Sequence, residues 1–354
     1  MTPGLQVQPI LGRAAAATVV MGILKFSLDV ISLKWPKPYV VVATQEVRRE
    51  SRPLADVVKH VLIFLWLGRL LPGGTEHPCF ARLLAWLNRP FFEWDVPFAA
   101  RGLDAASEVV AFCKTWGVPY PSPWPWAKAP AAFTTANDFF TRAYAPEHEP
   151  EKNLGDAFIL SPAVAVVTWF ASAAAMPRCV KNDRFTLAES GVPEPEKYQD
   201  YPCAMLYLAP ADYHCYHSPV QGRVVCCNLL NQERWSVTVK SYIFKHINIL
   251  TRNRRAVVVI QTPLGINVAM IIIGGVTVDS IRLDPCISVG AMVSQGQRIG
   301  AFARGGSAIA LFFSAPVELH RKCREAIAFA SADLGIGNGD FKVDCGASLA
   351  DVVK

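Results

Sequence analysis

The hydrophobic pattern of the chain changes about one third of the way along its length. Residues 56–71, 80–92 and 105–117 hold apolar side chains at helical spacing, which predicts amphipathic helices. From about residue 155 the apolar runs are shorter and rich in β-branched side chains, and turn residues separate them, which is typical of strands. We therefore predict an α+β protein, in which a helical N-terminal region precedes a mainly antiparallel β core.

Two further patterns set the predicted boundaries. Residues 118–130 hold five prolines and two tryptophans, a composition that stops helices and predicts an extended connector. The chain thus divides into an apolar helical region at 1–117, the connector at 118–130 and a second domain at 131–354. In that domain, strands are predicted within residues 222–227, 235–244, 255–265, 267–281 and 308–313.

Composition excludes several classes of protein. The chain has 354 residues, of which 52% are hydrophobic and only 18% are charged, so it is not largely disordered. Its net charge of +6 is too small to indicate nucleic-acid binding, and no basic stripe with interleaved aromatic residues occurs. The ten cysteines lack paired CxxC spacing, which argues against a zinc site and a small disulfide scaffold and favours an intracellular protein.

The N-terminal region carries two apolar runs that bear on membrane association. Residues 14–24 form an uncharged run, and residues 61–68 form a shorter one. A spanning helix needs about 20 apolar residues, so these runs predict a buried or surface-bound helix rather than a polytopic protein. Because Arg13 precedes the first acidic residue, Asp29, this end also resembles a transit peptide or signal anchor. We expect a membrane-associated location in mitochondria or endomembranes.

Two histidines, His214 and His217, lie three positions apart in a segment bounded by prolines. At this spacing both imidazoles can face one pocket, where a neutral histidine can serve as a general base. Spacing alone leaves two other interpretations open. The pair is also consistent with surface histidines without a role, or with two metal ligands, although no third ligand lies close in sequence.

A second unusual segment places Gly305, Gly306 and Ser307 between two apolar runs. The glycines allow backbone conformations closed to other residues and let another group approach the Gly306 carbonyl. A hairpin turn that contains a hydroxyl is the alternative interpretation, whereas a phosphate-binding loop is disfavoured because a strand-like segment follows. Earlier in the chain, residues 133–142 predict a short helix.

Taken in order, these segments resemble the motifs of the phosphatidylserine decarboxylase family. FTTANDFFTR at 133–142 is similar to FxxFFxR, and APADYHCYHSPVQG at 209–222 is similar to APxDYHRxHxPxxG. IGAFARGGSAIALFF at 299–313 resembles xGxFxxGSTxxxxF, the segment at which chains of that family cut themselves. Residues 267–281 and 341–350 also resemble family strands, so the likeness runs from about residue 130 to the C-terminus.

The resemblance implies a pyruvoyl-dependent decarboxylase that is made as a proenzyme. Ser307 would attack the Gly306 carbonyl, cut the chain there and become a covalent pyruvoyl cofactor, whose carbonyl accepts electrons as CO2 leaves the substrate. Chains 1–306 and 307–354 would stay associated, and no metal is implied. The same resemblance makes His217 the base for Ser307, and makes His214 the group that acts at the substrate carboxylate or reprotonates the product carbon. The implied substrate contacts are Asp138, Phe139, Arg142 and Tyr213.

The sequence departs from the family at the SPxDG motif. Val164 stands where the family has an aspartate, and Ala165 where it has a glycine. The aspartate orients the base histidine, so we expect His217 to lack an orienting partner unless another acid, such as Asp156 or Asp183, replaces it.

Three functions fit these expectations. The first is conversion of phosphatidylserine to phosphatidylethanolamine, because an apolar N-terminal region can rest on a bilayer and present the site to lipid headgroups. The second is decarboxylation of a free aromatic amino acid such as tryptophan. The third is a processing-deficient, non-enzymatic relative that binds at a membrane, which Val164 favours. The expected partners are the phospholipid or amino acid, a membrane surface and, as in many family members, a second copy of the chain; nucleic acid is not expected.

Overall fold

The structure, a computed structural model, describes residues 38–49, 93–118, 124–150, 154–155, 157–175, 187–230, 253–274, 280–303, 307–334 and 341–353. The helices predicted at 56–71 and 80–92 and the strand predicted at 235–244 lie outside these residues. One compact unit comprises residues Tyr39–Arg48 and Trp94–Lys354. Residues from 94 onward therefore group with the β core, whereas the sequence pattern placed the boundary at 117.

Most of the described secondary structure is strand. The strands are β1 (Pro38–Val41), β2 (Glu46–Arg49), β3 (Phe158–Leu160), β4 (Ala165–Phe170), β5 (Cys203–Leu208), β6 (Cys215–His217), β7 (Gly222–Leu230), β8 (Arg255–Gln261), β9 (Asn267–Ile273), β10 (Ser280–Leu283), β11 (Met292–Val293), β12 (Arg298–Ala303), β13 (Ser307–Phe313), β14 (Val317–Leu319), β15 (Phe341–Val343) and β16 (Ser348–Val352). The α-helices are α6 (Ala105–Trp116), α7 (Ala136–Phe140), α8 (Leu187–Ser190) and α10 (Arg321–Leu334).

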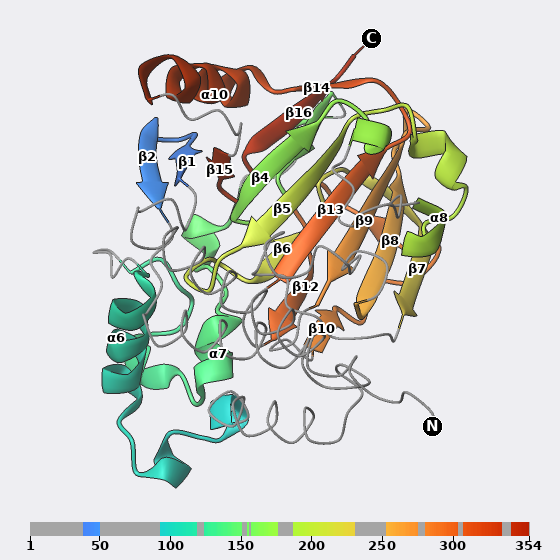
Figure 1. The fold of residues 1–354 in the computed structure, drawn as a ribbon. Helices are drawn as coiled ribbons and strands as arrows, with labels where there is room; N and C mark the ends of the chain where they lie inside the picture. The colour runs from blue at the N-terminus through green and yellow to red at the C-terminus, as the bar shows by residue number, and fades with distance from the viewer. Residues whose placement is uncertain are drawn as a thin grey trace, which may run out of the picture. The chain divides into compact units, whose positions relative to one another are not determined.

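The strands form one large sheet and two small ones (Figure 1). The large sheet has the order β11-β7-β8-β9-β13-β5-β4-β15-β1-β2. Pairing is antiparallel from β11 to β15, and β1 joins β15 in parallel. The small sheets have the orders β10-β12-β6 and β14-β16-β3. The described residues thus confirm an α+β protein with a mainly antiparallel β core.

The central strands are apolar throughout because both faces of the sheet are covered. Along β8 and β9 alternate side chains belong to two different buried clusters, as the two-residue period of a strand requires. Val258, Met270 and Leu311 lie in one cluster, whereas their neighbours Val257 and Ile271 lie in the other. A strand that is buried on both faces appears in the sequence as a nearly continuous apolar run. This is why the sequence predicts these strands.

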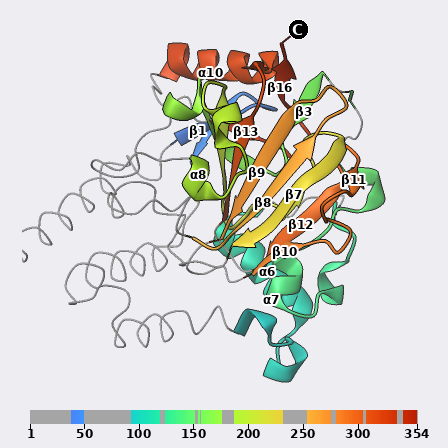
Figure 2. The same ribbon diagram turned by 90° about the vertical axis from the view of Figure 1, so that its right-hand side faces the viewer.

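Three helices lie near the ends of the strands of the large sheet: α10 at one end, and α6 and α7 at the other (Figures 1 and 2). The start of α6 is capped by Asp104, whose carboxylate accepts the Ser107 N–H at 2.9 Å, and Gly117 ends the helix in the left-handed conformation. The buried face of α6 packs in one cluster with Phe133, which precedes α7, and with Phe139, which lies within α7. The helices predicted at 105–117 and within 133–142 are confirmed.

The two strands that flank the Gly-Gly-Ser segment belong to different sheets. The first, β12, pairs with β10 and β6, whereas β13 pairs with β5 and β9 in the large sheet. The hairpin interpretation of Gly305, Gly306 and Ser307 is therefore wrong, because the strands of a hairpin pair with each other.

Close packing fixes one glycine of this region, Gly300 in β12. A Cβ atom at this position would lie 2.5 Å from the Tyr216 hydroxyl oxygen and closer still to the Arg282 carbonyl oxygen. The Tyr216 hydroxyl itself donates to that carbonyl at 2.8 Å. Only a glycine lets the three strands of this small sheet approach so closely.

Candidate active site

The turn between β5 and β6 carries His214 and is held by Asp212, and His217 is the last residue of β6. The Asp212 carboxylate accepts the Ala209 N–H at 2.9 Å, which closes the turn. The same carboxylate forms a partly buried ion pair with Lys342 of β15. A carboxylate that is both hydrogen-bonded and paired with a cation favours one conformation of its segment, and this segment leads directly into His214.

His214 is fully buried and has one free ring nitrogen. Its Nδ1 lies 2.8 Å from the Asp212 carbonyl oxygen, so Nδ1 carries the proton and Nε2 carries the lone pair. Nε2 is buried and has no hydrogen-bond partner among the described residues. The ring packs on Phe140 of α7 with centroids 3.8 Å apart. Burial, followed by the positive charges of Arg142 and Lys342, lowers the pKa of His214 from 6.5 to about 3. His214 is therefore a neutral imidazole with an available acceptor at physiological pH.

His217 is also buried, but both of its ring nitrogens are bonded. Nδ1 donates to the Gly296 carbonyl oxygen at 2.8 Å, so Nε2 accepts the hydroxyl of Tyr213 at 2.9 Å. Burial raises the pKa of Tyr213, which keeps this hydroxyl protonated as a donor. The expectation that His217 lacks an orienting partner is wrong, because a backbone carbonyl supplies one. Asp156 and Asp183, the alternative acids, lie outside the described residues.

Val164 lies in an apolar cluster beside this pair of side chains. It packs with Tyr213, Cys215, Ala301 and Cys345, and the rings of Trp126 and Tyr144 cover the cluster. Where the family motif has a carboxylate, this chain thus has the apolar side chain of Val164, which packs against Tyr213, the residue that binds His217.

The described residues on either side of the predicted cleavage segment are placed by their backbone partners. At its start, the Phe302 N–H of β12 donates to the His214 carbonyl oxygen at 2.8 Å. At its end, Ser307 opens β13 opposite Leu208, the last residue of β5 before the turn. Two residues that flank this segment are therefore placed beside the turn: Phe302 bonds to the backbone of His214, and Ser307 pairs with Leu208. His217, in contrast, pairs with Arg298 at the other end of β12. Gly306 lies outside the described residues, and Ser307 is described by its backbone.

The four residues predicted to contact substrate are arranged around α7 and the turn. Asp138 accepts the Thr134 N–H at 3.0 Å and pairs with Lys128 at 2.7 Å, so it stabilises the start of α7. Phe139 is buried within the cluster under α6. Arg142 donates to backbone carbonyls, and Tyr213 binds His217. Their contact with substrate stays a prediction.

Sequence reasoning missed three contributors to this site. Asp212 and Lys342 pair across 130 positions of the chain, and the Gly296 contribution comes from its backbone oxygen. A signal for Asp212 was present in the DYH motif, and one for Lys342 in the segment 341–350. The carbonyl of Gly296 leaves no trace in the sequence, because every residue has one.

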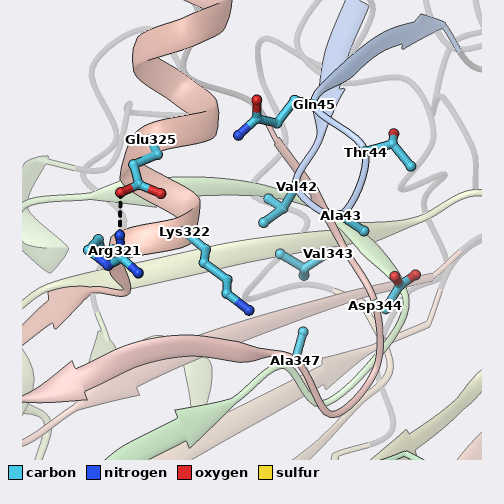
Figure 3. A pocket seen from close by; sticks show the side chains of 10 residues that line it. All are labelled: Val42, Ala43, Thr44, Gln45, Arg321, Lys322, Glu325, Val343, Asp344 and Ala347. Carbon is cyan, nitrogen blue, oxygen red and sulfur yellow. Dashed lines mark hydrogen bonds and ion pairs between the residues drawn. The ribbon is translucent and has the colours of Figure 1, made fainter.

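A separate hollow of about 480 Å³ lies between α10 and the turn that joins β1 to β2 (Figure 3). In Figure 3 the side chain of Lys322 extends from α10 toward Val343 and Ala347, and Arg321 pairs with Glu325 at 2.8 Å. None of the predicted site residues lines this hollow, so we assign it no part in the chemistry of the histidine turn.

The described residues hold neither a metal-binding cluster nor a membrane-spanning helix. Within those ranges no three His, Cys, Asp or Glu side chains come together so that they could hold a metal ion. In the same part of the chain, every helix is too short or too polar to cross a bilayer.

Comparison with known proteins identifies the family. The phosphatidylserine decarboxylase family model matches residues 136–335. A phosphatidylserine decarboxylase proenzyme of Chlamydia trachomatis is 30% identical over 185 residues, which cover 51% of this chain and 60% of the relative. That of Chlamydia pneumoniae is 26% identical over 252 residues, or 68% of this chain and 74% of the relative. The Saccharomyces cerevisiae phosphatidylserine decarboxylase proenzyme 2 is 28% identical over 181 residues, which span 50% of this chain and 16% of the relative. The chain therefore belongs to the phosphatidylserine decarboxylase family.

Proposed function

We propose that the protein is a pyruvoyl-dependent decarboxylase that cuts itself between Gly306 and Ser307 and converts phosphatidylserine to phosphatidylethanolamine. Family membership supports the reaction class. The observation that carries the proposal for this chain is the placement of the residues that flank the cleavage segment: Phe302 bonds to the backbone of His214, and Ser307 pairs with Leu208. A buried imidazole whose Nε2 has no partner among the described residues suits a serine that must lose its proton.

In this proposal His214 Nε2 takes the proton of the Ser307 hydroxyl. The hydroxyl oxygen then bonds to the Gly306 carbonyl carbon, and the peptide C–N bond breaks to leave an ester. Elimination removes the Cα proton of residue 307 and breaks its Cβ–O bond, which frees the Gly306 carboxylate. Water then adds to the carbon that bears the remaining nitrogen, and loss of that nitrogen as ammonia leaves a carbonyl. The sequence resemblance gave the role of base to His217, but both nitrogens of that ring are bonded, so the geometry favours His214.

The chain's own residues also fit the cofactor that this cleavage makes. A pyruvoyl group at residue 307 supplies an electrophilic carbonyl that accepts electrons as CO2 leaves. Among the described residues, His214 Nε2 is a buried acceptor without a partner, and in this proposal it orients a substrate or holds a proton. Asp212 and Lys342 fix the turn, which keeps this nitrogen in place.

Self-cleavage is tested by the size of the purified protein on a denaturing gel. We expect the parent chain to yield two fragments, 1–306 and 307–354, and Ser307→Ala to stay intact at 38.8 kDa and to release no CO2. His214→Gln should slow cleavage about 10²-fold or more, the usual contribution of a general base, while His217→Gln leaves it largely intact. The reverse pattern would restore His217 as the base.

Substrate choice is tested by release of labelled CO2. We expect release from carboxyl-labelled phosphatidylserine in vesicles and none from carboxyl-labelled tryptophan in solution. Release from tryptophan alone would favour the amino-acid decarboxylase. An intact chain that releases CO2 from neither substrate would favour the non-enzymatic relative. The argument for that alternative from Val164 is weakened, because the Gly296 carbonyl orients His217 in place of the missing aspartate. We also propose that the protein acts at an intracellular membrane, through residues 1–117.

A further inference from the structure

Arg142 is a cation sealed inside the protein. It is only 2% exposed, and its guanidinium carbon lies 4.4 Å from the ring centroid of Trp126 and 4.9 Å from that of Phe139. A planar guanidinium can stack between two rings in this way, and the contact with their π-faces offsets part of its lost hydration. The side chain is thus enclosed between the proline-rich connector and α7.

The hydrogen bonds of Arg142 lead to the histidine turn. Its Nη2 donates to the carbonyl oxygens of Ala211 at 2.9 Å and Asp212 at 3.1 Å, and its Nη1 donates to that of Phe139 at 3.3 Å. The Asp212 oxygen is the same atom that accepts the His214 Nδ1–H at 2.8 Å. One carbonyl therefore joins the guanidinium to the imidazole, and Arg142 fixes the acceptor that sets the His214 tautomer.

We propose that Arg142 is a positioning residue that fixes the orientation and tautomer of His214, rather than a ligand of the substrate. This inference rests on the proposed function only in that the proposed function makes His214 the base. The hydrogen bonds that carry it do not depend on the reaction.

The positive charges near His214 also favour its neutral form. Arg142 and Lys342 are the cations that act on His214, and both oppose its protonation. The Asp212 carboxylate is paired with Lys342, and Phe140 covers the ring with an apolar face. Removing the charge of Arg142 should therefore raise the pKa of His214, whereas Arg142→Lys keeps a charge but cannot span two carbonyls.

The test is a titration of the seven histidines by NMR of the full chain with nitrogen-15 labelled imidazoles, in a Ser307→Ala background that cannot be cut. His214 is assigned by the signal that His214→Gln removes. In the parent we expect His214 to stay a neutral Nδ1–H tautomer through the range near pH 6.5 in which ordinary histidines titrate. Arg142→Gln should raise its pKa by about one unit or more. Arg142→Lys should leave the pKa low but mix the two tautomers.

A buried arginine elsewhere in the fold provides the matched control. Arg255 is 1% exposed and donates to the carbonyl oxygens of Ser190 at 2.6 Å and Glu189 at 2.8 Å. Arg255→Gln should lower the free energy of unfolding as Arg142→Gln does, yet leave the His214 titration and tautomer unchanged. In the cleavable chain, only the Arg142 variants should slow cleavage, by about tenfold or more.

Either of two results would overturn the inference: a parent His214 that titrates like an ordinary histidine, or Arg142 variants that leave its pKa and tautomer as in the parent. The parent titration requires no substitution of Arg142, so it decides even if Arg142→Gln fails to fold. Because the titration uses an uncut chain, a failed decarboxylase assay would count against the proposed function and not against this positioning role.

Discussion

Replacing Val164 with aspartate tests whether the Gly296 carbonyl holds His217. The substitution restores the carboxylate of the family motif, but the site is closed to water: Val164 is 9% exposed and packs with Tyr213 and other apolar or protonated side chains. His217 Nδ1 already donates to Gly296, so the new carboxylate would compete for a bonded proton. We therefore expect Val164→Asp to destabilise the protein and not to speed cleavage.

The size of the effect follows from burial. A buried site of this kind raises a carboxyl pKa by about 3 units, and each unit corresponds to about 1.4 kcal/mol, so the cost at neutral pH is about 4 kcal/mol. Because the folded pKa lies above the unfolded one, the cost is largest above the folded pKa. It disappears as the pH falls below the unfolded value of about 3.9.

Urea unfolding between pH 8 and pH 4 measures this cost when all chains carry Ser307→Ala. The control is Val164→Asn, because asparagine has the size of aspartate but no charge. Its loss in the free energy of unfolding, relative to the parent, should not change with pH. If Val164→Asp does not lower the free energy of unfolding at pH 8, the reasoning is refuted. A cleavable Val164→Asp chain that cuts faster than the parent would refute it too, since the carboxylate would then have reached His217.

Three other substitutions probe the same region by urea or thermal unfolding. Tyr213→Phe removes the donor of His217 Nε2 and should cost about 1–3 kcal/mol, the usual penalty for an unpaired buried polar atom; unchanged stability would contradict that hydrogen bond. Lys342→Met leaves the Asp212 carboxylate buried without its cation and should cost about 3–5 kcal/mol, part of which Asp212→Asn should recover in the double variant; simple additivity would contradict the pairing. Gly300→Ala forces neighbouring backbone apart and should cost about 1–3 kcal/mol; an unchanged Tm would mean that the strands can separate freely.

The strands of the core could be predicted because their environment is uniform. Both faces of β8, β9 and β13 are covered, so each strand appears in the sequence as a nearly continuous apolar run. Their partners could not be predicted, because a strand's neighbour is chosen by contacts between distant segments. Thus β13 lies between β5 and β9, and β12, only a few residues before it, joins another sheet.

The site divides in the same way. The spacing of His214 and His217 and the glycines before Ser307 could be recognised because they are features of the sequence itself. The catalytic role of these residues stays a prediction. The groups that assign each histidine its role are the backbone oxygens of Asp212 and Gly296, which any residue could supply. Their positions depend on the folded path of the chain.

The location of Ser307 at the head of a central strand has a consequence for the product of cleavage. Residues 307–354 include β13, held by β5 on one side and β9 on the other, and also β15 and β16, which pair with β4 and β3. After the proposed cut, the shorter polypeptide would remain interleaved with the longer one in two sheets. To leave, it would have to break several ladders at once, which amounts to unfolding the core. The nicked molecule would thus be an inseparable heterodimer of its own fragments, and neither fragment could be exchanged for a fresh copy during its working life.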